Sequence, residues 1–408
     1  MQTTLAAFLQ GTQEGAEAES ILRACVHCGF CTATCPTYQL LGDELDGPRG
    51  RIYLIKQVLE GAQPTRKTQL HLDRCLTCRN CETTCPSGVR YGRLLDIGRK
   101  LVDERVARPL GERIRRTTLK GVLPRAALFK SAVRMGRALR PVLPRALQDK
   151  LQPVRDPGRS PARAHARKML MLDGCVQPAL APNINAAAAR VLDALGVQLI
   201  VAPKAGCCGA LRFHLNEQEA GLDDMRRNVD AWWPYVEQVE AIVMTASGCG
   251  VTVKEYGHLL AHDPQYAERA RRIGAMTRDL SEVLPQFEQQ LAVLVPMRGR
   301  GEQRVAYHPP CTLQHGQQIR GQVESVLRAA GIDVVLCADS HLCCGSAGAY
   351  SLLHPDIAHE LRERKLASLA ATGADEIVSA NIGCITHLQS GAAVPVTHWI
   401  ELLDRVMK

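Results

Sequence analysis

The second half of the chain alternates short apolar runs with stretches whose apolar residues recur at helical spacing. The first of these helical stretches covers residues 184–195 and ends at Gly196. Short strands separated by helices are typical of β–α–β units, which build a parallel sheet. The runs that we predict as strands are residues 168–172, 197–201 and 241–244.

The same order of runs occurs a second time. Cys175 and Cys207, which follow the first two runs, are 32 residues apart, and Cys311 and Cys343 in the later copy have the same spacing. Equal spacing of this kind indicates an internal repeat. We therefore predict two α/β repeats, each with a mainly parallel sheet. The strands expected in the second copy are residues 304–308, 332–336 and 376–379.

The N-terminal part has a different pattern. Apolar residues recur at helical spacing in residues 52–59, which follow Pro48 and precede Gly61, and again in residues 94–102. These are the marks of amphipathic helices. We predict a mostly α-helical module here, so the fold class is α+β with several domains, a helical module followed by two α/β repeats.

A basic segment separates the two parts. Residues 99–168 contain 20 Lys and Arg against 5 Asp and Glu, although the whole chain has a net charge of only +9. Its apolar residues recur at helical spacing among the arginines and prolines. A basic amphipathic helix can lie on an anionic membrane surface or dock on an acidic partner, and the third alternative is a linker with solvated arginines. No nucleic-acid recognition motif accompanies the charge, so we expect no nucleic acid as a partner.

Composition narrows the class of protein. The chain is 46% hydrophobic and 22% charged, as in a folded globular protein. No apolar run reaches the ~18 residues of a membrane span, and the polar N-terminus has no apolar core of an export signal. We therefore expect a cytoplasmic protein, in which the 17 cysteines are better explained as metal ligands than as disulfides.

Eight of the cysteines form two copies of the spacing C-x-x-C-x-x-C-x-x-x-C-P. In ferredoxins with two [4Fe–4S] clusters, the fourth cysteine of each such copy ligates the other cluster. Structural zinc sites separate two C-x-x-C pairs by a dozen or more residues, so zinc is the weaker interpretation. The predicted ligands of the first cluster are Cys25, Cys28, Cys31 and Cys85. Those of the second cluster are Cys75, Cys78, Cys81 and Cys35.

Basic residues accompany the two motifs. We expect them to offset the negative charge of thiolate-bound clusters, and the alternative is a solvated surface position for each. These residues are Arg23, Arg49, Arg51 and Arg74.

Each α/β repeat has four further cysteines, which follow predicted strands. Open α/β sheets bind their ligands at this carboxyl edge. The vicinal pair of each repeat precedes a glycine and suits a metal ion or an iron–sulfur cluster, and the alternative is a set of small buried side chains. The possible sites are Cys175, Cys207, Cys208 and Cys249, and in the second copy Cys311, Cys343, Cys344 and Cys384.

Other residues near these turns are less specific. Cys337 has no counterpart and is expected in the core. Histidine can serve as a metal ligand or proton carrier, although a hydrogen-bonded loop position is the simpler explanation for each one. The histidines concerned are His214, His308, His315, His341, His354 and His387.

Two ferredoxin-type motifs followed by two Cys-Cys-Gly turns resemble the iron–sulfur family that contains CCG domains. It includes iron–sulfur subunits of glycolate oxidase, lactate utilisation, anaerobic glycerol-3-phosphate dehydrogenase and heterodisulfide reductase. The similarity to the glycolate oxidase branch runs through nearly the whole chain. It is carried by residues 20–31, 42–51, 231–234, 340–348 and 380–384.

The resemblance implies an electron-transfer subunit, with no catalytic residue of its own, in a flavin-dependent complex that oxidises glycolate to glyoxylate. Its partners would be flavoprotein subunits and a quinone, at the inner face of the cytoplasmic membrane. No Gly-x-Gly-x-x-Gly follows a strand, so we expect neither flavin nor NAD in this chain. Alternatives are a complex that oxidises lactate or glycerol 3-phosphate, a self-contained disulfide or quinone reductase at the CCG sites, and an assembly or sensing scaffold.

One departure from the family concerns the end of each repeat. The heterodisulfide-reductase form ends in C-x-x-C, whereas Ala246 and Asn381 replace the first cysteine here. This disfavours a noncubane cluster with five thiolates.

The predicted domains are a ferredoxin-type domain with two clusters (1–105), a basic Pro/Arg-rich helical linker (106–166), and CCG repeats at 167–300 and 301–408.

Overall fold

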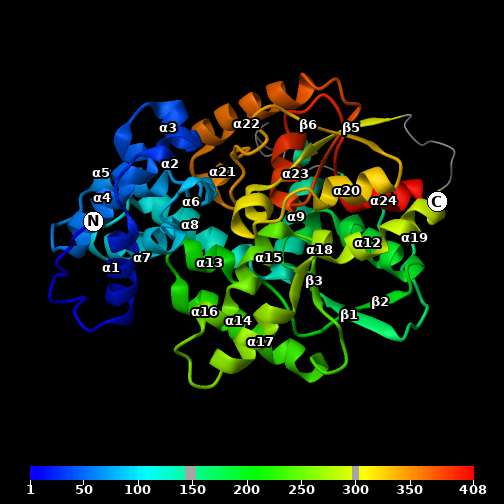
Figure 1. Cartoon of the computed structure of the whole chain (residues 1–408), viewed down its shortest axis with the longest axis horizontal. Coiled ribbons are helices and arrows are strands. Elements are labelled where there is room, and N and C mark those ends of the chain that lie inside the picture. The colour runs from blue at the N-terminus through cyan, green and yellow to red at the C-terminus, as the bar shows by residue number, and fades with distance from the viewer. Residues whose placement is uncertain (143–152, 296–302) are drawn as a thin grey trace. The chain divides into compact units, whose positions relative to one another are not determined.

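The structure, a computed structural model, describes residues 1–142, 153–295 and 303–408 (Figure 1). Two compact units are present, and each contains two stretches of chain. The first unit comprises residues 1–117 and 341–365, and the second comprises residues 118–340 and 366–408. The second predicted repeat therefore contributes chain to both units.

The first unit is built from helices, as the apolar pattern predicted. Leu22, Ile55 and Leu94, from α1, α4 and α7, are fully buried in its core. Gly98 allows α4 and α7 to pack closely, because a Cβ there would lie 2.6 Å from Ile55 Cγ1. The N-terminal helices are α1 (Gln13–Ala24), α2 (Phe30–Ala33), α3 (Pro36–Leu41), η1 (Glu44–Asp46), α4 (Pro48–Leu59), α5 (Arg66–Asp73), α6 (Asn80–Thr84) and α7 (Tyr91–Arg105).

The pattern analysis missed α1. Its start is set locally, since the Thr12 hydroxyl caps the helix by accepting from the Gly15 N–H at 3.0 Å. From the second repeat, this unit also contains α21 (Tyr350–Leu353) and the beginning of α22 (Pro355–Ala370).

Two four-stranded sheets lie in the second unit, and every strand pair in them is parallel. The strand order is β2-β1-β3-β4 in one and β6-β5-β7-β8 in the other, so both sheets have the same topology. This confirms the two α/β repeats. The strands are β1 (Arg167–Met171), β2 (Val197–Val201), β3 (Ile242–Met244), β4 (Thr277–Asp279), β5 (Arg304–His308), β6 (Asp333–Leu336), β7 (Glu376–Ser379) and β8 (Val396–His398).

The fourth strand of each sheet was not predicted. β4 and β8 have only three residues each, and the sequences Thr-Arg-Asp and Val-Thr-His are too polar to give an apolar run. They become strands through pairing with β3 and β7. A sheet edge of this kind depends on tertiary contacts more than on local sequence.

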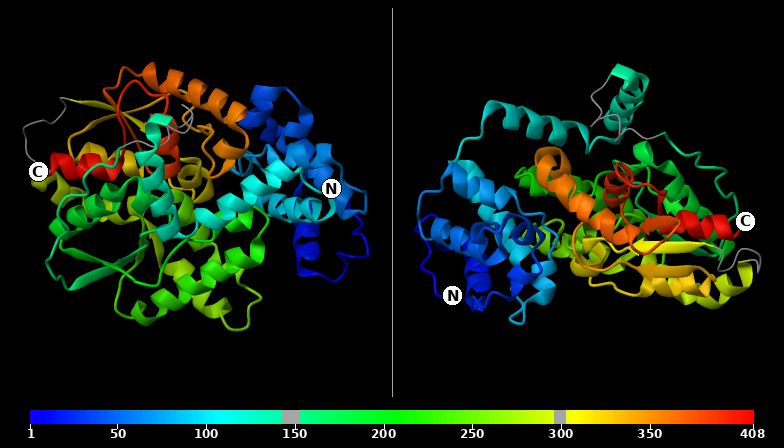
Figure 2. Two further views of the ribbon diagram at one scale, coloured as in Figure 1. Left: turned by 180° about the vertical axis from the view of Figure 1, so that it is seen from behind. Right: turned by 90° about the horizontal axis from the view of Figure 1, so that it is seen from above.

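Helices lie on both faces of the second sheet (Figure 2, right). The predicted helix 184–195 is α12 (Pro182–Ala194), and Gly196 follows it with φ +80°. The other helices of the first repeat are α11 (Gln177–Leu180), α13 (Ala210–His214), α14 (Gln218–Trp232), η3 (Trp233–Tyr235), α15 (Ser247–Lys254), α16 (Tyr256–Leu259), α17 (Ala267–Met276), α18 (Leu280–Val283), η4 (Leu284–Phe287) and α19 (Glu288–Leu294). Those of the second repeat are η5 (Thr312–Gly316), α20 (Gln322–Ala329), α23 (Ile382–Gln389) and α24 (Trp399–Val406), besides α21 and α22.

The basic segment is helical in its first part, whereas residues 153–165 contain neither helix nor strand. α8 (Leu110–Val122), α9 (Ala126–Ala138) and η2 (Arg140–Val142) account for most of residues 110–142. The end of the predicted linker includes residues 143–152, which lie outside the described part of the chain. Several apolar side chains of these helices are exposed: Leu110, Ile114, Leu128 and Met135.

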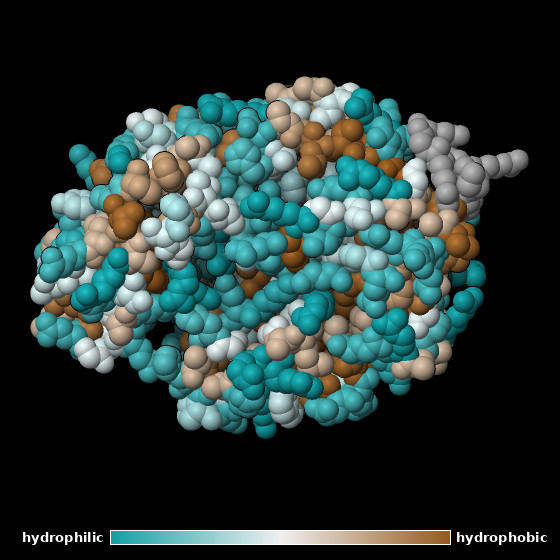
Figure 3. All heavy atoms as spheres, viewed as in Figure 1, coloured by the Kyte–Doolittle hydropathy of each residue, from teal (hydrophilic) through white to brown (hydrophobic). Residues whose placement is uncertain are grey.

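The outer face shown in Figure 3 is mostly polar, with apolar groups in small areas. Within the described ranges, no helix combines the length and apolar character that crossing a membrane requires.

Candidate functional site

The two cysteine motifs fold in the same way. In the first, Cys25 directly follows α1, Cys31 lies in α2, and Cys35 precedes α3. The backbone between them turns tightly, with positive φ at His27 (+59°) and Gly29 (+85°). The second motif repeats this plan after α5, with positive φ at Thr77 and Arg79.

Hydrogen bonds join the two motifs. The Asn80 side chain in α6 donates from Nδ2 to the main-chain oxygen of Thr34 at 3.1 Å. The hydroxyl of Thr84 donates to the hydroxyl of Thr34 at 3.2 Å. These contacts tie the end of each motif to the other, which is the arrangement that exchange of the fourth cysteine needs.

The four predicted ligands of the first cluster lie together. Burial raises the pKa of the Cys31 thiol to about 11, and the charges of Cys25, Cys85 and Cys28 add to the rise. These four cysteines also line one cavity, together with Cys81 of the second motif. Cys85 belongs to the second motif, and the structure brings it to the three cysteines of the first motif.

The other four cysteines lie together as well. Burial raises the pKa of Cys81 well above its ordinary value, and the charges of Cys78, Cys75 and Cys35 contribute. The charge of Glu82 acts in the same direction. Sulfurs whose negative charges oppose the ionisation of Cys81 are a poor arrangement for free thiolates and a suitable donor set for a soft metal centre.

The two sets differ in exposure. Near the first set, Cys28 is exposed, Val26 is 69% exposed and Phe30 is 62% exposed. In the second set, Cys35 and Cys81 are buried. The first set is therefore the more open to solvent within its unit.

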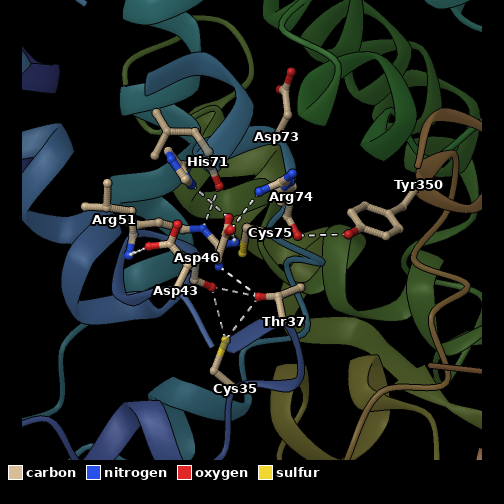
Figure 4. A network of polar contacts seen from close by, with 12 residues as sticks. Cys35, Thr37, Asp43, Asp46, Arg51, His71, Asp73, Arg74, Cys75 and Tyr350 are labelled. Atoms are coloured by element: carbon tan, nitrogen blue, oxygen red, sulfur yellow. Dashed lines mark hydrogen bonds and ion pairs between the residues drawn. The ribbon is translucent and has the colours of Figure 1, made fainter. Parts of the chain in front are cut away.

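A buried network of charges lies beside the second set (Figure 4). The Asp46 carboxylate accepts from the guanidinium groups of Arg51, at 3.3 Å, and Arg74, at 2.8 Å. It also contacts His71 Nδ1 at 3.1 Å. Burial acts to lower the pKa of Arg51, but the charges of Cys75, Tyr91, Cys35 and Asp46 outweigh it and raise that pKa above its ordinary value.

The four arginines singled out from the sequence thus divide into two pairs. Arg51 is fully buried, and Arg74 joins it at Asp46. Arg23 is largely exposed and pairs with Glu19, and Arg49 is partly exposed and pairs with Glu44. A buried arginine near Cys35 and Cys75 places positive charge close to the sulfurs, whereas an exposed ion pair is screened by water.

Part of the second repeat lies against the second set, in the same unit. Tyr350 donates from its hydroxyl to the main-chain oxygen of Arg74 at 3.0 Å, and Asn80 Nδ2 lies 3.3 Å from the main-chain oxygen of His341. Burial raises the pKa of Tyr350, and the charges of Cys75 and Cys343 act in the same direction. The turn with Cys343 and Cys344 therefore lies beside the loop of Cys75.

The cysteines of the first repeat form a continuous chain of contacts. Cys175 and Cys207 share a side-chain hydrogen bond, as do Cys207 and Cys208, and Cys208 and Cys249. The contact with Cys207 and burial raise the pKa of Cys175 well above its ordinary value. Cys175 follows β1 and Cys249 follows β3, the two strands between which the chain order of this sheet reverses, and such a point is the usual binding site of open α/β sheets.

The glycine of each Cys-Cys-Gly turn is required by close packing. Gly209 has φ +90°, and a Cβ there would lie 2.5 Å from the main-chain oxygen of Gly221. Gly345 also has φ +90°, and its Cβ would lie 2.5 Å from the main-chain oxygen of Ala358. No residue with a side chain fits either position without a shift of the neighbouring helix.

Two buried residues that the sequence analysis missed hold the first vicinal pair. Asn228 donates from Nδ2 to the main-chain oxygen of Cys207 at 2.8 Å. Tyr256 donates from its hydroxyl to the main-chain oxygen of Cys208 at 2.9 Å. Asn228 also donates to the Tyr256 hydroxyl at 3.1 Å. The available signal for Asn228 was a polar residue at helical spacing from the apolar Met225 and Trp232, on a buried face that Asp224 shares.

The cysteines of the second repeat are divided between the units. Cys343 and Cys344 belong to the first unit, whereas Cys311 and Cys384 belong to the second. Asn381, at the position of the missing cysteine, approaches Cys384 Sγ with Nδ2 at 3.6 Å and accepts from the Gly248 N–H at 3.3 Å. Ala246, the matching residue of the first repeat, is buried and offers no ligand atom.

The remaining candidates have varied surroundings. Cys337 is buried, as expected of a core residue. His308 is buried and bonds Ser379 Oγ through Nδ1 at 3.1 Å, His315 and His387 are buried, and His214 ends α13. The ring of His354 contacts that of Tyr350 with centroids 4.9 Å apart, and burial lowers its pKa to about 4.

Comparison with known proteins places these sites in context. Residues 21–89 match the family model of the 4Fe-4S dicluster domain, and residues 169–254 and 305–389 each match that of the cysteine-rich domain CCG. The chain is 56% identical to the glycolate oxidase iron-sulfur subunit of Escherichia coli, with 100% of both chains covered. It is 32% identical to the probable glycolate oxidase iron-sulfur subunit of Bacillus subtilis over 91% of this chain and 89% of that protein. Lactate utilization protein A of Geobacillus thermodenitrificans is 24% identical over 58% of this chain and 98% of its own.

Proposed function

The chain belongs to the family of glycolate oxidase iron–sulfur subunits, and we propose from this membership that it transfers electrons in a complex that oxidises glycolate to glyoxylate. The observation that carries the proposal is the pair of four-sulfur sets, each of which combines three cysteines of one motif with the fourth of the other. The 4Fe-4S dicluster domain that contains them supplies one-electron chemistry. Membership in this family implies partner subunits.

The proposed ligands follow the two sets. Cys25, Cys28, Cys31 and Cys85 would hold one [4Fe–4S] cluster. Cys75, Cys78, Cys81 and Cys35 would hold the other. Sulfur-only donor sets on tight turns suit iron–sulfur clusters, and the buried Arg51 and the partly exposed Arg74 offset the charge of the second set.

Flavoprotein subunits are the proposed electron donors. Oxidation of an α-hydroxy acid removes a hydride, and hydride chemistry requires a flavin or nicotinamide that a cysteine-based site does not supply. A membrane quinone is the proposed acceptor. The substrate comes from the family alone, because nothing in these sites selects a hydroxy acid.

Contact with the inner face of the cytoplasmic membrane is supported by α8 and α9. Leu128 and Met135 are exposed on α9, among the exposed Lys130 and Arg134. Cationic helices with exposed apolar side chains bind anionic lipid surfaces. Sedimentation with anionic vesicles tests this proposal: the full chain should bind them, and exchange of Leu128 and Met135 for Gln should weaken binding. Equal binding by both proteins would contradict it.

A third metal site is proposed in the first repeat. Four cysteines at the edge of the sheet contact one another pairwise, in the order Cys175, Cys207, Cys208 and Cys249. Ala246 removes the fifth thiolate, so this set favours a simpler centre than a noncubane cluster.

Analysis of the anaerobically purified chain tests the two proposed [4Fe–4S] clusters and the proposed metal site of the first repeat. Iron and sulfide are measured, and EPR spectra are recorded after reduction. Two cubane clusters correspond to about eight irons per chain, and a higher content indicates that the CCG cysteines bind metal as well. A colourless protein with zinc in place of iron, and with no EPR signal after reduction, would contradict the electron-transfer function.

Reconstitution with the partner subunits then tests the substrate. Glycolate-dependent reduction of a quinone analogue should require this chain. Full turnover without it, or turnover only with lactate or glycerol 3-phosphate, would contradict the proposed complex.

A further inference from the structure

Thr37 lies two residues after Cys35, the cysteine that joins the first motif to the second set. Its side chain is buried, with 1% exposure. Its hydroxyl oxygen lies 3.3 Å from Cys35 Sγ and accepts a hydrogen bond of 3.1 Å from the Arg51 guanidinium. The hydroxyl also lies 2.8 Å from the main-chain oxygen of Asp46, to which it donates (Figure 4).

Ligation changes which of these contacts is favourable. A thiol can donate a proton, but a metal-bound thiolate can only accept. The hydroxyl of Thr37 has one proton and two acceptors within reach, the Asp46 carbonyl and the Cys35 sulfur. A thiolate carries negative charge, and hydrogen bonds to charged acceptors are the stronger ones.

Arg51 fixes the direction of this hydroxyl. Because its guanidinium donates to Thr37 Oγ1, one lone pair of the oxygen is occupied and the proton must point elsewhere. Arg51 is itself held by Asp46 and by the main-chain oxygen of His71, to which Nε donates at 2.7 Å. The buried charge of Arg51 also polarises the hydroxyl and strengthens it as a donor.

The corresponding residue of the other motif has different surroundings. Ser87 stands two residues after Cys85, as Thr37 does after Cys35, with a proline between in both cases. Ser87 is exposed. The two motifs therefore share the hydroxyl in sequence, but only Thr37 is buried beside an arginine.

From these contacts we propose that Thr37 is a positioning residue for the second cluster: its hydroxyl, oriented by Arg51, donates to the ligating sulfur of Cys35 and raises the reduction potential of that cluster. Hydrogen bonds to ligand sulfurs stabilise the more negative, reduced state, which shifts the potential upward. The inference rests on the proposed function, because it requires clusters at both sets.

The test uses the anaerobically purified full chain and an EPR-monitored redox titration. Thr37→Ser and Thr37→Ala differ by one oxygen atom, so comparison of the two isolates the hydroxyl from the packing of the methyl group. We expect Thr37→Ser to keep the wild-type midpoint potential of the second cluster and Thr37→Ala to shift it to a more negative value. Ser87→Ala is the matched control and should leave both midpoints unchanged.

Equal midpoints in the Thr37→Ser and Thr37→Ala proteins would overturn the proposal. Loss of iron from Thr37→Ala, with iron retained in Thr37→Ser, would also overturn it, because the hydroxyl would then serve structure alone. These failures are distinct from failure of the proposed function, in which the wild-type chain itself would contain no reducible cluster.

Discussion

The hydroxyl of Tyr350 donates a hydrogen bond of 3.0 Å to the main-chain oxygen of Arg74, although 276 residues separate the two in sequence. Arg74 directly precedes Cys75, a proposed ligand of the second cluster. Through this hydrogen bond α21 of the second repeat contacts the loop of Cys75 in the ferredoxin-type region, within one compact unit. The second repeat is therefore part of the environment of that cluster.

Replacement of Tyr350 by Phe removes this hydrogen bond and leaves the ring. The partly buried main-chain oxygen of Arg74 then loses a partner, so we expect the free energy of unfolding of the first unit to fall by about 1 kcal/mol. Urea unfolding of the anaerobic protein measures the change. Tyr53→Phe is the control, because Tyr53 is about half exposed. An equal effect of the two substitutions would contradict the prediction.

Replacement of Cys78 by Ala should remove the second cluster. Three sulfurs of the set remain, and about four irons per chain should be lost, since each cubane holds four. The N-terminal helices should also become less stable. Cys337→Ala, which removes a buried thiol outside both sets, should keep the wild-type iron content. Unchanged iron in Cys78→Ala would refute the ligand assignment.

Replacement of Cys208 by Ser tests the proposed site of the first repeat. Cys208 lies outside both four-sulfur sets, so the iron content of the ferredoxin-type region should stay unchanged. Serine preserves the size of the side chain but removes a soft ligand, so electron transfer to quinone should slow. Turnover of the reconstituted complex, measured beside iron content, decides the result. Wild-type turnover would show that these thiols are structural.

Gly209→Ala should destabilise the second unit. The added Cβ would meet the oxygen of Gly221 at 2.5 Å, and the left-handed backbone adds strain, so a loss of about 2–3 kcal/mol is expected. Gly196→Ala is the matched control, since Gly196 also has positive φ but nothing lies within 4 Å of its Cβ position. Urea unfolding should show the smaller loss for the control, and equal losses would rule out the close contact as the cause.

Acid should weaken the second unit through His398. Burial lowers the pKa of His398 to about 3, and its Nδ1 accepts from the Ile400 N–H at 3.1 Å, so the folded state needs the neutral ring. In the unfolded chain the ring protonates near pH ~6.5. The unfolded state thus binds more protons between these values, and stability falls as the pH decreases through that window.

Substitution of His398 by Asn keeps a capping side chain without a titratable ring. Urea midpoints of the second unit, compared at about pH 7.5 and 5.5, should differ less in His398→Asn than in the wild type. His262→Asn, at an exposed position, should leave the pH dependence unchanged. A wild-type pH dependence in His398→Asn would contradict the prediction.

Much of this protein follows from its sequence alone. The spacing of the eight cysteines predicted two sets that exchange their fourth members, because sulfurs three residues apart on a tight turn share one centre while the fourth points away. The alternation of apolar runs and helices predicted the two parallel sheets. In both cases the sequence signal is a short pattern that occurs twice, although the contacts it predicts join cysteines and strands that lie far apart in the chain.

Other features exist only in the tertiary structure. The strands β4 and β8 are too short and polar to stand out and form by pairing with a neighbour. The ion pair of Arg74 with Asp46, the hydrogen bond of Asn228 to Cys207, and that of Tyr350 to Arg74 all join residues distant in sequence. Nothing local marks such pairs, because burying a charged or polar group costs free energy unless a partner bonds to it, and only the folded chain brings that partner close.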